Sequence, residues 1–80
     1  MAKQETLDRV IAVTARVLGL DTGEITPDNN FIFDLGAESV QSVELVASFE
    51  TEFDIDMDQD EALAVQTVSD AADFIEKHLS

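Results

Sequence analysis

The chain has 80 residues, which is enough for one small hydrophobic core, so we expect a single domain over residues 1–80. Its formal net charge is −14, from 18 acidic residues against four Lys and Arg, and this charge argues against nucleic acid and anionic membranes as partners. The chain has no Cys, so neither disulfides nor thiolate metal sites can hold the fold together.

In the first segment, apolar residues recur at three- and four-residue spacing, which predicts an amphipathic helix over residues 3–18. Gly19 is placed to end this helix, because glycine readily adopts the left-handed conformation found just past helix ends. Residues 20–38 lack a helical period and are rich in turn formers, which predicts one long loop. We expect the loop to be pinned over the core by Ile25, Phe31, Ile32 and Leu35.

The next segment predicts a helix over residues 39–53 with an apolar stripe of Val43, Val46, Phe49 and Phe53, flanked by Leu45. A loop over residues 53–58 and a short helical turn over residues 59–64 follow. Thr67 and Asp70 have the spacing of a helix start, and the apolar period after them predicts a final helix. The fold class is therefore all-α, a small bundle of three main helices plus one short helix, with the long loop between the first two.

The residues that most enzymes use are scarce in this chain. It has no Cys, Tyr or Trp, and its single His, His78, stands in the last turn of a predicted helix, where a cation stabilises the helix dipole. The acids from Asp54 to Asp60 suggest a calcium loop, but an EF-hand starting at Asp54 places Gln59 where glycine is required. We therefore expect neither catalysis nor a metal site.

Ser39 is the residue whose position indicates chemistry. It falls at the start of the second helix, where free backbone N–H groups and the positive end of the helix dipole stabilise a negative group. Gly36 permits a sharp turn just before it. A phosphodiester on the Ser39 hydroxyl would lie in such an anion site, although Ser39 considered alone is explained better by a simple helix cap, and it is the surrounding sequence that favours attachment.

The segment from Phe31 to Val46 resembles the attachment region of acyl carrier proteins, usually written Asp-Leu-Gly-Ala-Asp-Ser-Leu followed by Val-Glu-Leu. The resemblance continues through the end of the second helix to Thr67 and Val68, and so covers nearly the whole chain. The departures from the pattern cluster near Ser39, and are Phe33, Glu38, Val40, Gln41 and Ala47. They point to a specialised carrier that a narrower set of enzymes recognises.

The resemblance implies that a phosphopantetheinyl transferase moves 4'-phosphopantetheine from coenzyme A onto Ser39. The protein then holds acyl chains as thioesters and delivers them to synthases and transferases with basic patches, in fatty acid, lipid or polyketide biosynthesis. It catalyses nothing itself. We expect a cytoplasmic or plastid-like monomer, because no stretch has the length and hydrophobicity of a membrane span or signal peptide.

The resemblance also assigns two groups of residues. The positions matching the surface that contacts partner enzymes are Glu38, Val40, Glu44, Ala47, Glu50, Glu52 and Met57. In the family, the acyl chain folds back between the second and third helices, and the residues expected to line that pocket are Phe31, Val43, Val46, Leu63, Val65 and Val68. The run from Asp34 to Glu61 holds no Lys or Arg, so the negative field centres on the attachment site and favours basic partners.

Two other interpretations stay open. The first is an unmodified acidic adaptor that binds a basic partner, with Ser39 acting only as a cap. The second is a peptidyl or aminoacyl carrier, although Gly36-Ala37-Glu38 and the strong acidity favour the acyl type.

Overall fold

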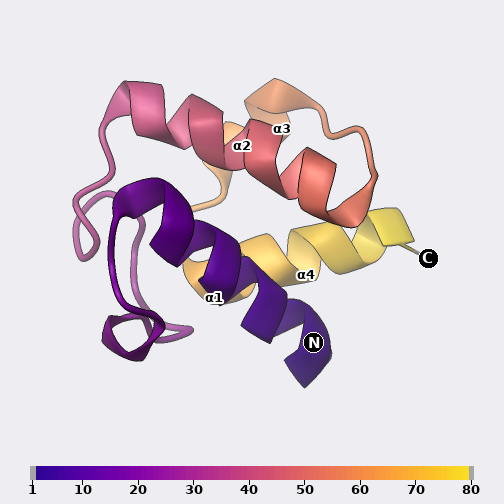
Figure 1. The fold of residues 1–80 in the computed structure, drawn as a ribbon. Coiled ribbons are helices and arrows are strands. Elements are labelled where there is room, and N and C mark those ends of the chain that lie inside the picture. Colours follow the sequence, from indigo (N-terminus) through magenta and orange to yellow (C-terminus); the bar gives the residue numbers. More distant parts are fainter. Residues whose placement is uncertain (1, 80) are drawn as a thin grey trace.

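Helix α1 (Gln4–Leu18) packs against both other long helices in the computed structural model, which describes residues 2–79 (Figure 1). Its inward face is fully buried at Val10 and Thr14, and the Thr14 hydroxyl donates to the Val10 carbonyl. The helix ends at Gly19, whose φ of 71° is left-handed, and the Leu20 N–H donates to the Ala15 carbonyl at 2.9 Å. The helix therefore ends where the sequence predicted.

The connection after α1 is a long loop that contains one turn of 3-10 helix, η1 (Thr22–Glu24). Ile25 and Phe31 are buried and fix the loop to the core, as expected. The prediction for Ile32 is wrong, because its side chain is 59% exposed. Residues 31–35 form a tight turn around Asn30, and Ile32 and Phe33 stand on the outside of that turn.

Helix α2 (Ser39–Phe53) buries Leu45, Val46, Phe49 and Phe53. Leu45 is therefore a core residue rather than a flank, and Val43, which we placed in the inner stripe, is 45% exposed. At about 100° per residue, the buried residues define a face with Ser42 near its middle and Val43 beyond its edge. The helix ends at Asp54, which adopts a left-handed φ of 54° although it is not glycine.

The short helix α3 (Gln59–Ala64) and helix α4 (Val68–Leu79) complete the domain. The Thr67 hydroxyl accepts the Asp70 N–H at 3.1 Å, which confirms the predicted start of the last helix. The long loop is joined to this point by three backbone hydrogen bonds, from Phe31 N–H to the Gln66 carbonyl at 2.9 Å, from Val68 N–H to the Asn29 carbonyl at 3.0 Å and from Ser69 N–H to the Pro27 carbonyl at 2.9 Å. Loop and helix start are thus held side by side.

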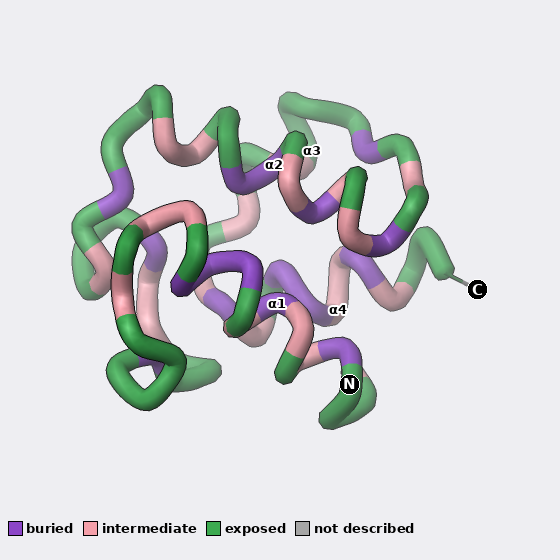
Figure 2. The backbone as a smooth tube through the Cα atoms, viewed as in Figure 1, coloured by how far each residue is buried: buried purple, intermediate pink, exposed green. Residues whose placement is uncertain are grey.

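These elements make an all-helical bundle with three long helices and one short one, as predicted, and residues 2–79 contain no strand. The most deeply buried segments face one another across the middle of the molecule, while the loop and the first turn of α2 are largely exposed (Figure 2). None of the helices described has the length and hydrophobicity needed to cross a membrane.

Arg9 connects α1 to the end of α2. Its Nε donates to the Glu52 carboxylate at 2.9 Å, and its Nη2 donates to the Glu52 backbone carbonyl at 2.7 Å. Its guanidinium also lies 4.3 Å from the centroid of the Phe53 ring. One basic side chain thereby satisfies a carbonyl in the last turn of α2, where the helix supplies no partner.

Candidate functional site

Ser39 is the first residue of α2, and its side chain is exposed. The residue that caps the helix is Glu38, whose backbone is extended, and the Gln41 side chain reaches back to accept the Glu38 N–H at 3.0 Å. The Ser39 hydroxyl forms no hydrogen bond with any other residue in the range 2–79. It therefore does not cap the helix and remains accessible from solvent.

The turn before Ser39 fixes where the hydroxyl stands. Gly36 has a left-handed φ of 73°, a conformation that glycine adopts without a Cβ penalty. Its N–H donates to the Ile32 carbonyl at 3.1 Å, and the Ala37 N–H donates to the Phe31 carbonyl at 2.8 Å. Because Ala37 is itself buried, the chain is anchored two residues before Ser39.

Ser42 is the other hydroxyl in the first turns of α2, and its environment differs. Its Oγ donates to the Glu38 carbonyl at 3.2 Å, and its side chain is half-buried. By contrast, the Ser39 and Val40 N–H groups donate to no described residue, as is usual for the first turn of a helix. An anionic substituent is therefore stabilised at Ser39 and not at Ser42.

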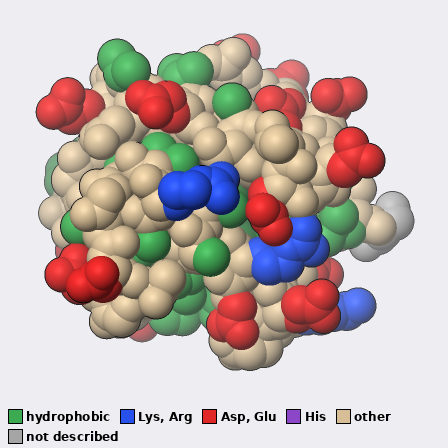
Figure 3. All heavy atoms as spheres, in the orientation of Figure 1, with side chains coloured by type: hydrophobic (Ala, Val, Ile, Leu, Met, Phe, Trp, Pro, Cys, Tyr) green, Lys and Arg blue, Asp and Glu red, His purple; other side chains and the backbone are tan. Residues whose placement is uncertain are grey.

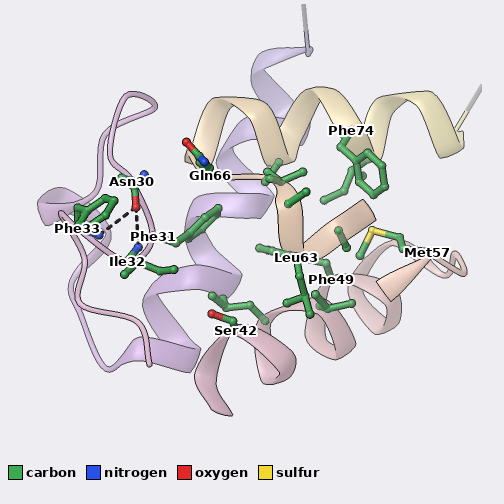
Figure 4. A pocket seen from close by; sticks show the side chains of 17 residues that line it. Asn30, Phe31, Ile32, Phe33, Ser42, Phe49, Met57, Leu63, Gln66 and Phe74 are labelled. Carbon is green, nitrogen blue, oxygen red and sulfur yellow. Dashed lines mark hydrogen bonds between the residues drawn. The ribbon is translucent and has the colours of Figure 1, made fainter. Parts of the chain in front are cut away.

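An apolar cavity of about 320 Å³ lies between α2, α3, α4 and the turn of the long loop (Figure 4). Of the residues expected to line an acyl pocket, Phe31, Val46, Leu63 and Val65 do line this cavity. Val43 and Val68 do not, because Val43 lies on the exposed side of α2 and Val68 is wholly buried in the core. Figure 4 shows the Phe31 ring directed into the cavity from the loop.

Sequence reasoning missed several lining residues. Phe49 was expected only as part of the core, and Phe74, Ile75 and Ser42 were not assigned to the cavity at all. The helical period of α4 carried a signal for Phe74 and Ile75, since they follow Ala71 by three and four residues. Ser42 stands one turn after Ser39 on the same side of α2 and lines the cavity, so a group attached at Ser39 has a direct route along the helix to this space.

Residues 8–75 match the family model described as the phosphopantetheine attachment site. The chain belongs to this family. It is a phosphopantetheine carrier, with 4'-phosphopantetheine as its prosthetic group. Domains of this family are non-catalytic, and in general they interact with phosphopantetheinyl transferases and with enzymes that handle acyl groups.

The acidic surface of this carrier domain is less uniform than its sequence suggests. Glu38 and Glu44 are exposed, whereas Glu52 pairs with Arg9 and the Glu50 carboxylate accepts the Met57 N–H at 2.8 Å. The assignment of Met57 to the partner surface is wrong, because its side chain is buried and lines the cavity. The left-handed turn at Asp54 and the bond to Glu50 bring Met57 inward.

Apolar side chains share this surface with the acids. Val40 is 69% exposed, and Ala47 is also exposed on the outer side of α2. In Figure 3, hydrophobic side chains reach the surface along the top edge over α2, acidic groups are spread around the rim, and basic groups lie near the middle and at the lower right. No three acidic or histidine side chains among residues 2–79 are arranged to hold a metal ion.

Proposed function

We propose that Ser39 carries the phosphopantetheine and that residues 1–80 act as a single acyl carrier domain. The observation that supports this most directly is the state of the Ser39 hydroxyl, which is exposed and unbonded at the N-terminus of α2. A cap would use that hydroxyl, and here Glu38 and Gln41 close the helix without it. The adaptor interpretation explained Ser39 as a helix cap, and other residues fill that role here.

Residues of this chain fit the prosthetic group at both ends. The N–H groups of Ser39 and Val40 are free at the N-terminus of α2, where they and the helix dipole would attract a phosphodiester on the Ser39 hydroxyl. The arm's terminal thiol supplies the chemistry, because it holds an acyl group as a thioester. The apolar cavity one turn away shelters the chain from water.

The lining of the cavity favours acyl over aminoacyl or peptidyl cargo. Its polar side chains are Asn30, Ser42 and Gln66, and none of the residues in the range 2–79 that line it is acidic or basic. An ammonium group brought into this space loses its hydration without gaining a charged partner, which is costly. A hydrocarbon chain gains free energy from the same surroundings.

The charges support transfer between separate enzymes rather than self-assembly. A net charge of −14 opposes the approach of a second copy, so the carrier acts as a monomer. The same charge, with Glu38, Glu44, Val40 and Ala47 exposed around Ser39, attracts synthases and transferases that have basic patches. The carrier itself contributes no catalysis and works in the cytoplasm, in fatty acid, lipid or polyketide biosynthesis.

Intact-mass measurement tests the attachment point. The apo-protein is incubated with coenzyme A and a broad-specificity phosphopantetheinyl transferase, beside Ser39→Ala and Ser42→Ala. We expect one phosphopantetheine on the wild type and on Ser42→Ala, and none on Ser39→Ala. Addition to Ser39→Ala, or no addition to the wild type while a control carrier is modified, contradicts the proposal.

A further inference from the structure

Two large apolar side chains are presented to solvent on the turn that precedes Ser39. Phe33 is 88% exposed and Ile32 is 59% exposed, although the neighbouring Phe31 is buried. Both side chains border the cavity, and Figure 4 shows the Phe33 ring beside Asn30, directed away from the Phe31 ring. An exposed apolar pair at a functional site is a feature of binding surfaces, since water contact with a phenyl ring carries a free-energy cost that only a partner removes.

The turn holds this pair in one conformation. The Asn30 Oδ1 accepts the N–H groups of both Ile32 and Phe33 at 2.9 Å, and the Asp34 carboxylate accepts the Asn30 N–H at 2.7 Å. The Leu35 N–H adds a bond to the Asn30 carbonyl at 3.0 Å. A side chain displayed on an ordered turn loses little conformational entropy when it binds.

The pair also lies within reach of any enzyme that acts on Ser39. The Ala37 N–H donates to the Phe31 carbonyl at 2.8 Å, and Phe33 and Ser39 each stand two residues away from that bond. At about 3.5 Å per residue, this limits the separation of their Cα atoms to roughly 20 Å. A standard interface of about 800 Å² on each partner covers such a distance.

We propose that Ile32 and Phe33 form a docking element for the phosphopantetheinyl transferase that modifies Ser39, whose surface offers an apolar pocket bordered by Lys or Arg. The inference rests on the proposed function, because it takes Ser39 as the modified residue. The transferase is the partner that must bring its active site to the Ser39 hydroxyl itself, so it covers the adjoining turn. The exposed carboxylates of Asp34 and Glu38 beside the pair favour a basic border.

The other occupants of this surface are less suitable. A second copy brings the same acids to the interface and is repelled by them. An anionic membrane is repelled for the same reason. The carrier's own cavity does not cover the pair, because Ile32 and Phe33 border it and still remain 59% and 88% exposed.

Steady-state kinetics of the same transferase test the docking element. The apo forms of wild type, Phe33→Ser, Phe33→Leu and Leu79→Ser serve as substrates, with saturating coenzyme A. Leu79 is the matched control, because it is also exposed, at 45%, but stands at the end of α4. Circular dichroism first establishes that each variant is folded. If Phe33→Ser does not fold, Phe33→Leu supplies the measurement.

We expect Phe33→Ser to raise KM for the carrier about ten-fold, equivalent to about 1.4 kcal/mol, with kcat changed by less than about two-fold. Phe33→Leu should give a smaller increase, and Leu79→Ser none. A KM for Phe33→Ser close to that of the wild type overturns the inference. It is also overturned if Phe33→Ser changes only self-association in sedimentation, or only the melting temperature of the acylated form. Failure of the wild type to be modified at Ser39 defeats the proposed function instead, and the docking element with it.

Discussion

Lengthening the acyl chain on the carrier should raise its melting temperature carbon by carbon and then have no further effect. Each CH₂ moved from water into the cavity contributes up to about 0.8 kcal/mol. If each CH₂ contributes half that value, and the melting temperature of a domain of this size rises by about 4–8 °C per kcal/mol, each added carbon raises the melting temperature by about 2–3 °C. The effect requires that the chain leave the cavity when the protein unfolds.

The size of the cavity sets where the increase stops. An apolar cavity of about 150 Å³ holds one benzene molecule, and the cavity here measures about 320 Å³, so about twelve carbons is the upper limit. Because Ile32 and Leu63 at its lining are partly open to solvent, we expect the plateau between roughly eight and twelve carbons.

Thermal unfolding of thioesters from about four to about sixteen carbons, followed by circular dichroism, measures both quantities. Ala62→Phe places a ring into the cavity from α3 and should move the plateau to shorter chains. Ala12→Phe makes the same change on the exposed side of α1 and should leave the plateau in place. Equal melting temperatures at every chain length, or one plateau shared by Ala62→Phe and the wild type, would refute the reasoning.

Three further predictions concern stability. Arg9→Ala should lower the free energy of unfolding in urea by about 2 kcal/mol more than Arg16→Ala does, because both variants remove one charge but only Arg9 bonds to Glu52 and covers Phe53. Equal losses in the two variants would contradict this. Asp54→Gly should raise the melting temperature and Asp54→Ala lower it, since the left-handed φ there suits glycine; the reverse order would exclude backbone strain as the cause. Added salt or magnesium should raise the melting temperature by screening repulsion among the acids, and a fall would show that this repulsion is already compensated.

The helices were predictable from the sequence because their signals are local. The period of apolar residues gave α2 its observed bounds, the short helical turn expected over residues 59–64 is α3, and Gly19 marked the end of α1. The position of Ser39 at the start of α2 followed from the same signals. The free state of its hydroxyl did not follow, since Ser39 is a common capping residue and only the contact between Gln41 and Glu38 shows that the cap is elsewhere.

The errors arose where tertiary contacts decide the direction of a side chain. Met57 follows a left-handed turn whose angle the sequence does not give, and its bond to Glu50 turns it inward. Ile32 has the hydrophobicity of a core residue, yet the Asn30 turn places it outside. Val43 and Val68 are apolar like the cavity residues, but Val43 lies on the exposed side of α2 and Val68 is buried too deep in the core to reach the cavity.

The closure of α2 by Glu38 and Gln41 has a practical consequence for how this protein can be used. Since the hydroxyl of Ser39 is not needed to hold the helix, we expect that an arm attached there, as proposed, can be hydrolysed off and a new one installed while the polypeptide stays folded. One molecule should therefore accept a new arm repeatedly. It can equally accept fluorescent or crosslinking analogues of pantetheine as reagents, without any redesign of the scaffold.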